Sequence, residues 1–493
     1  IRGGNFTGGI NTVKNDLFGV LTINGGNFSN TAQYVIMNWN KAEITAGTFQ
    51  TLDTASAVLF TSAFGSNANY VGELTISGGE FKHASDTPEM IVDHYDESNK
   101  GNAVVTGGKF DADISKYIPT DYVQSADGTV EKLGETNAVA KVGGTYYKTL
   151  ADAVAAAQDG DTITLLKDAE LTSTLNLAKN ITIDGQGKYT IKAANSFTVG
   201  SDNKTYCVLY VSGEVTLKDV TVNGNEKCRV IFCDKGKLTI DGATITNGKA
   251  PNFIGGVYMT SSASFEMKSG SITGNKNAKG YQNGEYLQYS SDLWIGANAN
   301  GALTAINGGT IGNVFVNANA WSASNPGSFT MNGGTVTNLY VEHDANYGAT
   351  FKYNDGTIEH LYLSKENGNG QSIEVTPVKG VIYNGGVKEQ DLVTLTMKYN
   401  DGATADSTYN VASGTTITLP TPRRSGYTFK GWKIALHEGE QIPGFTGTYT
   451  SEQVKDIVFA EAATDGGAIN RFSDGAYLTA VWSANSYYYY SSA

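Results

Sequence analysis

Short runs of alternating apolar and polar residues, each followed by glycines, recur along the whole chain. The segment 21–30 reads LTINGGNFSN, in which Leu21 and Ile23 point to one face of a strand and the polar residues beside them point to the other. The two glycines then allow a sharp bend with positive φ, after which Phe28 turns back to the apolar side. A second alternating run, QYVIMNW, follows at 33–39. One repeat therefore predicts short strands joined at tight corners.

The same phrase returns at intervals of roughly 20–40 residues, which is typical of a solenoid or a propeller. Its further copies are ITAGTF at 44–49, LTISGGEF at 74–81, VVTGGKF at 104–110, IDGATI at 240–245, MKSGSI at 267–272, AINGGTI at 305–311, MNGGTV at 331–336, YNDGTI at 353–358 and IYNGGV at 382–387. A propeller blade needs about 40 residues or more, and most of these units are shorter. In a parallel β-helix, each repeat gives one strand to each of several long sheets. We therefore predict a mainly β fold, a parallel β-helix (solenoid) with glycines at its corners.

The refrain stops after residue 110 and resumes in the second half of the chain, so we expect two β-helical blocks. The expected order is a truncated first block at 1–120, a connecting hairpin at 121–137 and a second block at 138–390. Asp127-Gly128 is a favourable two-residue turn for the hairpin. Because the opening residues IRGGNFTGG already belong to a repeat, we interpret the chain as a fragment of something longer.

One convincing helix is predicted at about 149–159, at the start of the second block. Thr149 is a plausible N-cap, and Gly160 can end the helix. Leu150 and Ala153 share an apolar face with the residues a turn later. The first coil of a solenoid exposes its core, so an amphipathic helix is expected to cap it.

Composition limits the partners that the chain can have. The formal net charge is −13, which argues against nucleic acid and gives no reason for attraction to an anionic membrane. No apolar run reaches the roughly 20 residues of a membrane span, so we expect no membrane insertion. The three cysteines, Cys207, Cys228 and Cys233, favour small buried thiols, with one disulfide between neighbouring coils as the alternative. We expect no zinc site, since no histidine lies near them in the sequence.

The β-helical segments resemble a known family. KVGGTYYKTLADAVAAAQDGDTITLLKD at 141–168 and NITIDGQGKYTI at 180–191 resemble the opening of pectate-lyase-like right-handed β-helix domains, especially those of large bacterial surface proteins. GGKFDADISKYIPTDYV at 107–123 resembles the closing phrase of such blocks. The resemblance covers about 1–390 and implies a right-handed parallel β-helix.

The segment 391–483 resembles the internalin-type B-repeat, also called the Listeria–Bacteroides repeat. The matching parts are LTMKY at 395–399, GTTITLPTPRRSGYTFKGW at 414–432 and LTAVW at 478–482. The resemblance implies a small β-grasp-like module of bacterial cell-surface proteins. In it we expect Tyr427 and Phe429 to alternate inward and Trp432 and Trp482 to anchor the core. The connection before LTAVW is longer than is usual in the family, and the tail 484–493 is expected to be a linker or disordered.

Catalysis finds little support in the sequence. β-Helices carry polysaccharide lyases and glycoside hydrolases, but within the blocks the arginines are only Arg2 and Arg229, and neither lies in a recognisable motif. The chain has no Asp-Asp pair and no Gly-His-Gly segment, although two carboxylates on different coils could still flank a cleft. We therefore expect no catalytic residue, no metal site and no cofactor, and we keep a carbohydrate-active enzyme as the alternative.

The histidines are further candidates for metal ligands or proton carriers. His343 lies beside Glu342 and Asp344, and His360 was expected one coil later, so a stacked Glu–His pair could bind a metal or move protons. A solvated polar corner is the favoured interpretation. For His83 and His94 in their loops, a solvated loop is favoured over a calcium-like cluster.

An aromatic insertion is the candidate ligand-binding site. KNAKGYQNGEYLQYSSDLWIGANAN at 276–300 causes the longest spacing between repeats and combines aromatic rings with amides. Such aromatic platforms are typical of sugar-binding surfaces; the alternative is that the rings pack against the coil. The candidate residues are Tyr281, Gln282, Tyr286, Tyr289 and Trp294, joined by Trp321 one rung further.

Together these features predict a non-catalytic fragment of an extracellular, cell-surface or cell-wall-anchored protein, attached through parts of the parent chain outside this sequence. It would act as an adhesin or stalk that displays and binds, with glycans or host and bacterial surface proteins as partners. A purely structural spacer is the second alternative.

Overall fold

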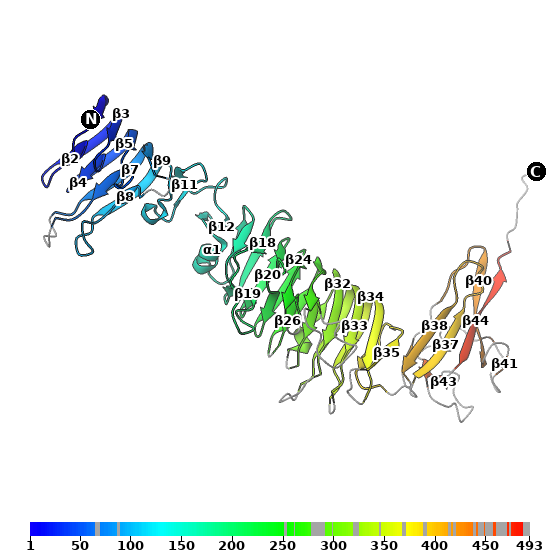
Figure 1. The fold of residues 1–493 in the computed structure, drawn as a ribbon. Coiled ribbons are helices and arrows are strands. Elements are labelled where there is room, and N and C mark those ends of the chain that lie inside the picture. The colour runs from blue at the N-terminus through cyan, green and yellow to red at the C-terminus, as the bar shows by residue number, and fades with distance from the viewer. Residues whose placement is uncertain are drawn as a thin grey trace, which may run out of the picture. The chain divides into compact units, whose positions relative to one another are not determined.

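The computed structural model describes most of the 493 residues, and the chain forms two compact units, Ile1–Ala156 and Ala157–Ala493. The residues outside the description are 65–69, 86–88, 251–253, 261, 278–290, 298, 319–324, 345–346, 367–370, 388–391, 413–415, 418–420, 437–439, 442–447, 449–456, 460–470, 473–474 and 487–493. The fold is mainly β and rich in parallel pairing, as predicted (Figure 1). Among the described residues there is one α-helix, and no helical segment has the length and apolarity of a membrane span.

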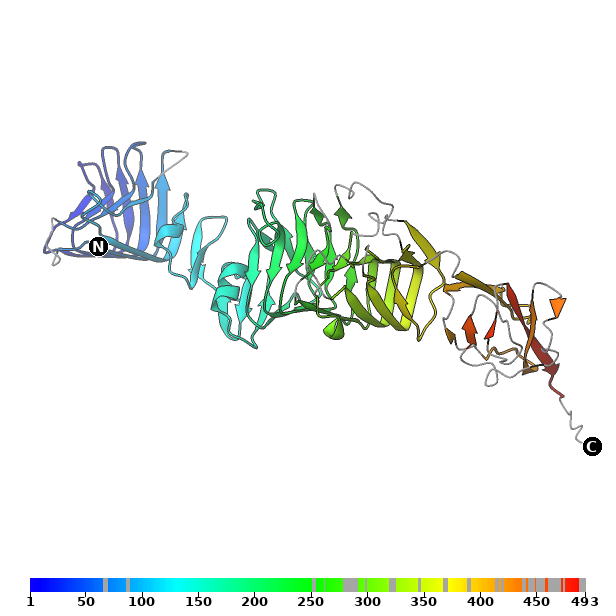
Figure 2. The same ribbon diagram turned by 90° about the horizontal axis from the view of Figure 1, so that it is seen from below.

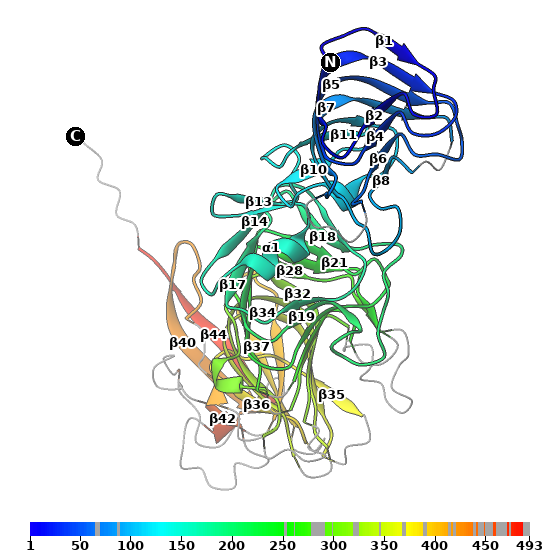
Figure 3. The same cartoon turned by 90° about the vertical axis from the view of Figure 1, so that its left-hand side faces the viewer.

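The first unit contains two sheets that follow different sides of the repeat, as Figure 3 shows. The larger sheet has the order β1 (Asn5–Thr7), β3 (Val20–Asn30), β5 (Lys41–Thr51), β7 (Glu73–His83), β9 (Asn102–Phe110), β11 (Thr129–Lys132) and β10 (Tyr122–Gln124). The smaller sheet has the order β2 (Val13–Asn15), β4 (Ile36–Asn38), β6 (Leu59–Thr61) and β8 (Ile91–Val92). From β1 to β9 all of these pairs are parallel, so equivalent residues of successive repeats lie side by side.

Identical side chains stack on one another through the core of the first unit. Phe28 stacks between the rings of Phe6 and Phe49, with ring centroids 4.9 Å apart on both sides. The stack continues through Phe81 to Phe110 at 4.8 and 4.4 Å. Such stacked rings add to the energy of burial and fix the register of the strands.

The glycines of the refrain bend a strand rather than end it. Gly26 lies inside the long strand β3 with a φ of +118°, and the register between β3 and β5 shifts between Ile23 and Asn27. A Cβ atom at Gly26 would lie 3.1 Å from the carbonyl oxygen of Gly4. The sequence thus predicted the positive φ and the return of Phe28, but the corner is a bulge within one strand.

A hairpin and the α-helix come after the parallel strands in the sequence. β10 and β11 pair antiparallel in the hairpin that the Asp-Gly turn predicts, but three residues form the loop, because the backbone N–H of Ser125 donates to Thr129 O at 2.8 Å. After the antiparallel pair β12 (Ala140–Val142) and β13 (Thr145–Tyr147), helix α1 spans Leu150–Ala156. Thr149 caps it, since its hydroxyl accepts the backbone N–H of Asp152 at 3.1 Å. A short 3-10 helix, η1 (Ser115–Tyr117), lies between β9 and β10.

From β14 to β34, most strands of the second unit pair in parallel with the equivalent strand of the next repeat, so three ladders result (Figure 2). The first ladder contains β14 (Thr162–Leu165), β17 (Ile181–Asp184), β20 (Glu214–Lys218), β23 (Lys237–Asp241), β27 (Ser264–Met267), β31 (Ala305–Ile306) and part of β33 (Ser328–Val341). The second contains β15 (Ala169–Leu171), β18 (Thr190–Ala193), β21 (Thr221–Asn223), β24 (Thr244–Thr246), β28 (Ser271–Ile272) and β32 (Thr310–Val316). The third contains β16 (Leu175–Leu177), β19 (Cys207–Val211), β22 (Arg229–Cys233), β26 (Val257–Met259), β30 (Leu293–Ile295) and then β32, β33 and β34 (Thr350–Ser364).

The parallel arrangement ends with two antiparallel strands. β35 (Ser372–Val375) and β36 (Ile382–Asn384) both pair with β34 in the reverse direction. Smaller elements of this unit are the pair β25 (Lys249–Ala250) and β29 (Lys276–Asn277) and the 3-10 helix η3 (Gly301–Leu303).

The C-terminal segment forms a mixed five-stranded sheet and a small three-stranded sheet. The first has the order β38 (Ser407–Ala412), β37 (Leu392–Lys398), β44 (Ala476–Ala484), β40 (Tyr427–Leu436) and β41 (Glu440–Gln441), and the second has β39 (Thr416–Ile417), β42 (Ile457–Phe459) and β43 (Arg471–Phe472). Trp432 is fully buried, and Phe429 and Trp482 pack against the same cluster.

The expectation that Tyr427 points into this core is wrong. Its side chain is 38% exposed, and the guanidinium of Arg424 lies 3.8 Å from its ring centroid. A bulge between Phe429 and Gly431 places Phe429 and Trp432 on the same side of β40. Tyr427, at the beginning of the strand, lies beyond the cluster that these two rings form.

Candidate functional site

Of the six residues predicted to bind a ligand, the structure describes one. Tyr281, Gln282, Tyr286, Tyr289 and Trp321 lie outside the described residues. Trp294 lies in β30 and is only 7% exposed. Its ring therefore presents little surface to a ligand.

Trp294 belongs to a row of aromatic side chains that runs along the third ladder. The row consists of Tyr210, Phe232, Tyr258, Trp294, Phe315, Tyr340 and Tyr362, each in register with the next. The ring of Trp294 stacks on that of Phe315 with centroids 4.3 Å apart. Residues on either side of this row, such as Leu293 and Ile295, point to the opposite face of the sheet. Most of the row is buried, with Ile254 packed against it, whereas Tyr258 and Tyr362 are partly exposed.

Arg229 is held beside this aromatic row. Its guanidinium lies 4.7 Å from the ring centroid of Tyr258, and its Nε donates to the carbonyl oxygen of Ile254 at 3.0 Å. Its Nη1 donates to Asn203 Oδ1 at 3.2 Å, and the side chain is 2% exposed. These contacts bury Arg229 among packed side chains. It is therefore not accessible to a substrate, as the arginine base of a lyase must be.

Asp292, which the sequence did not single out, is a buried carboxylate next to Trp294. Its Oδ1 accepts the backbone N–H and the side-chain amide of Asn275 at 3.1 and 2.8 Å. Its Oδ2 accepts the backbone N–H of Asn313 at 2.9 Å and the hydroxyl of Ser291 at 3.1 Å. Burial raises the pKa of this carboxyl. Because donors of the protein surround both oxygens, we interpret Asp292 as a corner brace.

The three cysteines are free and buried. Burial raises the pKa of the Cys207, Cys228 and Cys233 thiols to about 12. A nucleophilic or metal-binding cysteine needs its thiolate form, which burial disfavours here. These residues are therefore small core side chains.

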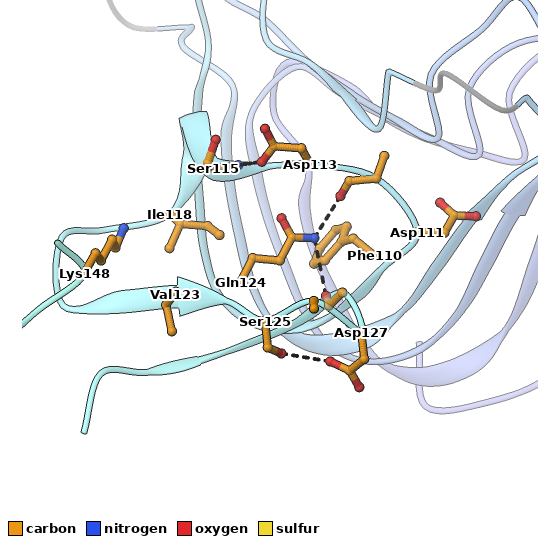
Figure 4. A pocket seen from close by; sticks show the side chains of 13 residues that line it. Phe110, Asp111, Asp113, Ser115, Ile118, Val123, Gln124, Ser125, Asp127 and Lys148 are labelled. Atoms are coloured by element: carbon orange, nitrogen blue, oxygen red, sulfur yellow. Dashed lines mark hydrogen bonds between the residues drawn. The ribbon is translucent and has the colours of Figure 1, made fainter. Parts of the chain in front are cut away.

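A groove with a volume of about 480 Å³ lies in the first unit between the end of β9 and the β10–β11 hairpin (Figure 4). Its polar lining side chains include Asp111, Asp113, Ser115, Gln124, Asp127 and Lys148. Gln124 ties the two walls together, because its Nε2 donates to Ala112 O at 2.8 Å and its Oε1 accepts the backbone N–H of Ile114 at 3.0 Å. Figure 4 shows Lys148 at one end of the groove and Asp111 at the other.

The chemistry of this groove favours turn formation over acid catalysis. The hydroxyl of Ser125, which donates to Asp127 at 2.8 Å, is the main cause that lowers the pKa of the Asp127 carboxyl. The backbone N–H of Thr129 adds a donor at 3.1 Å. An Asp held ionised in this way cannot serve as the general acid that glycoside hydrolysis requires. Within the described residues, no three His, Cys, Asp or Glu side chains converge so that they could hold a metal ion.

The histidines do not form the stacked pair that was considered. His360 is in register with Asn338, and its Nδ1 pairs with Glu374 Oε1 of β35 at 2.7 Å. The Oε2 of Glu342 instead accepts the side-chain amide of Asn317 at 2.6 Å.

The loop histidines of the first unit are tied to their surroundings. Backbone groups of Ser56 and Ser85 contact both ring nitrogens of His83, at 2.7 and 2.9 Å. His94 lies between Asp93 and Glu97, at 2.8 and 3.5 Å.

A second aromatic group, missed in the sequence, lies on the smaller sheet of the first unit. It consists of Tyr34, Trp39, Phe60, Phe64 and Tyr95, named here the Trp39 patch. In the sequence these rings resemble ordinary core residues of short strands. The available signal was that aromatic residues follow or occupy the second short strand of several successive repeats.

No protein-family model matches this sequence, and no curated protein is significantly similar to it. The candidate sites therefore depend on their own geometry.

Proposed function

We propose that this chain is a non-catalytic part of an extracellular, cell-surface protein, a stalk or adhesin that displays and binds surface glycans or proteins. In this proposal the two repeat blocks are right-handed parallel β-helices of the pectate-lyase-like kind. The C-terminal segment is an internalin-type B-repeat with a β-grasp-like fold. The single observation that carries the proposal is the in-register stacking of equivalent side chains along parallel ladders in both units.

Stacked repeats of this kind suit a display role. Each repeat contacts its neighbours through backbone hydrogen bonds and side-chain ladders, so stiffness arises from many equivalent contacts. Loops that leave the ladders can vary without disturbing them, which gives a scaffold for binding surfaces.

The chemistry of the described residues supports a non-catalytic role. Arg229 and Asp292 are buried and held by packing or hydrogen bonds. The groove carboxylate of Asp127 is kept ionised by its own turn. The two buried groups are closed off by their own contacts, and the groove carboxylate lacks the raised pKa that a general acid needs.

The C-terminal fold supports the B-repeat proposal. β37 and β44 pair in parallel while β40 and β44 pair antiparallel, and such a mixed sheet is compatible with a β-grasp-like module. The two tryptophans of the motif, Trp432 and Trp482, lie in or against its core.

The test is a glycan array probed with the whole 493-residue chain, together with binding to intact bacterial and epithelial cells. Saturable binding to a set of glycans or to a cell surface is expected. The same preparation is incubated with plant and bacterial polysaccharides, and new reducing ends and unsaturated uronides are measured. Release of either product would contradict the proposal in favour of a carbohydrate-active enzyme. Absence of binding to all glycans and cells would contradict it in favour of a spacer.

A further inference from the structure

The Trp39 patch differs from the aromatic row of the second unit because its rings reach solvent. The side chains of Phe64 and Tyr95 are 53% and 75% exposed. Trp39 and Tyr34 are partly exposed, and Phe60 forms the buried floor. Exposed apolar clusters are costly in water, and on folded proteins they often mark binding sites.

The patch is built on the outward face of β4 and β6. Leu59 and Thr61 point into the unit, so Phe60 between them points outward, in register with Met37 of β4. Trp39 follows β4, and its ring centroid lies 5.1 Å from that of Phe60 and 5.6 Å from that of Phe64.

Tyr34 and Tyr95 complete the surface from two sides. The ring of Tyr34 lies 4.9 Å from that of Phe60, and the ring of Tyr95 lies 6.4 Å from that of Trp39. The rings of Trp39 and Phe64 are nearly perpendicular, at 86°. The surface is thus stepped, with ring faces and edges at several heights.

Ser62 holds the loop that carries Tyr95. This residue is fully buried, and its hydroxyl donates to Asn99 O at 2.7 Å and accepts the backbone N–H of Tyr95 at 2.9 Å. The backbone N–H of Phe64 donates to Tyr70 O at 2.9 Å, which fixes the backbone at Phe64. The rings are therefore positioned before a ligand arrives, which lowers the entropic cost of binding.

Several charged side chains around the patch form ion pairs. Lys14, in register with Met37, lies 3.0 Å from Asp16. Around Tyr95, Lys100 pairs with Glu97 at 3.1 Å, and Lys116 pairs with Asp93 at 2.9 Å. Paired charges offer little to an ionic ligand, and the carboxylate of Glu89, which acts on Tyr34, would repel an anionic one.

We propose that the Trp39 patch binds a neutral polysaccharide, whose sugar rings pack their C–H faces on Trp39, Phe64 and Tyr95. The inference rests on the proposed binding function and assigns it a site and a ligand class. Sugar C–H bonds are weakly positive and match the negative face of an aromatic ring. The hydroxyls of a sugar bound in this way remain in water.

The test is affinity electrophoresis of the whole chain in native gels that contain a neutral glucan, xylan, mannan or galactan. Gels with polygalacturonate serve as the charged comparison. The double variant Phe64→Ala/Tyr95→Ala changes exposed side chains, and Tyr347→Ala, 43% exposed in the second unit, is the matched control. Circular dichroism and the thermal midpoint establish that each variant is folded.

Retardation by at least one neutral polysaccharide is expected, with affinity weakened at least about 10-fold in the double variant and unchanged in Tyr347→Ala. A polysaccharide-dependent change of tryptophan fluorescence gives a second readout, to which Trp39 contributes as one of the five tryptophans of the chain. A Trp39→Phe variant should lose the polysaccharide-dependent change of that signal.

Several results would overturn the inference. Equal retardation of the wild type and the double variant would place glycan binding elsewhere and leave the proposed function intact. Retardation by polygalacturonate alone would exclude a neutral ligand. A concentration-dependent dimer that the double variant abolishes, seen by light scattering without any retardation, would make the patch a contact between copies. If neither the glycan array nor the gels show any binding, the proposed glycan-binding function fails with it.

Discussion

At the residue scale, the stability of this protein depends on positions between successive repeats that accept only one residue type. At some of these positions only glycine fits. Gly47 has a φ of +131°, and a Cβ atom there would lie 3.1 Å from the carbonyl oxygen of Gly26 and from the ring of Phe49. Gly47→Ala should lower the free energy of unfolding of the first unit by about 1–3 kcal/mol, because alanine is strained at this φ. Chemical denaturation measures the loss. Gly134→Ala, which would meet no atom within 4 Å, is the control and should be near neutral.

Buried amides form a second set of such positions. Asn38 is fully buried; its Oδ1 accepts from Asn15 Nδ2 at 2.7 Å, and its Nδ2 donates to Thr61 Oγ1 at 3.1 Å and Glu73 O at 3.0 Å. Asn38→Ala leaves these groups buried without partners, so a loss of about 2–4 kcal/mol is expected on denaturation. Asn24→Ala removes an exposed hydrogen bond from the Asn24 amide to Thr45 Oγ1 and should lower the free energy of unfolding far less. Equal effects of the two variants would contradict the role given to the buried amide.

Because its thiols are buried, the protein should lose stability as the pH rises through the alkaline range. Burial raises the pKa of Cys207 from 9.0 to about 12, so the folded state favours the protonated thiol. Its stabilising contribution is complete below pH 9 and is lost as the pH rises toward 12, with a slope of about 1.4 kcal/mol per pH unit. Denaturation of the wild type and of Cys207→Ala between these pH values should show a shallower slope in the variant. Parallel curves would contradict the burial of this thiol.

At the element scale, the refrain allowed much of the fold to be predicted, because period-two alternation and glycine pairs are local features. Phe28 and Gly26 behave as the pattern indicates, and the short strands from β14 to β31 follow from the same alternation. The bulge inside β3 could not be predicted, since a strand that bends and a strand that ends have the same apolar pattern. Likewise, alternation predicts which residues share a face of a strand, but it does not predict which of the two faces becomes buried.

This last ambiguity explains the outcome for the candidate sites. Trp294 was chosen for its aromatic, amide-rich sequence context, yet it lies in a covered row. Trp39 lies in a segment that reads as an ordinary strand, yet its neighbours Phe64 and Tyr95 are exposed. Exposure depends on the loops packed over a face, which are distant in sequence, so local pattern alone does not determine it.

Helix α1 gives a prediction at this scale. Thr149 Oγ1 accepts the backbone N–H of Asp152 and donates to its carboxylate at 2.7 Å, a reciprocal cap at the first turn. Thr149→Ala should destabilise the protein by about 1 kcal/mol, and Thr149→Ser should restore most of it. Thermal unfolding followed by circular dichroism measures both. A serine variant as unstable as the alanine variant would show that the methyl group, not the cap, matters.

At the scale of the whole molecule, the chain divides into two compact units, each with its own aromatic stack. Phe49 and Phe315 are both fully buried and each stacks between two rings, but they belong to different units. Because chains with more than one compact unit commonly depart from two-state unfolding, we expect calorimetry to resolve two transitions.

The matched pair of variants Phe49→Ala and Phe315→Ala tests this division. Each removes a buried ring and should cost about 3–5 kcal/mol in its own unit, since the neighbouring rings cannot close the cavity without breaking their register. Phe49→Ala should therefore lower one calorimetric transition, and Phe315→Ala should lower the other. If either variant shifts both transitions together, stability is shared along the whole chain. The stacks would then act as parts of one cooperative structure, and a local change such as Gly47→Ala should also lower the transition of the second unit.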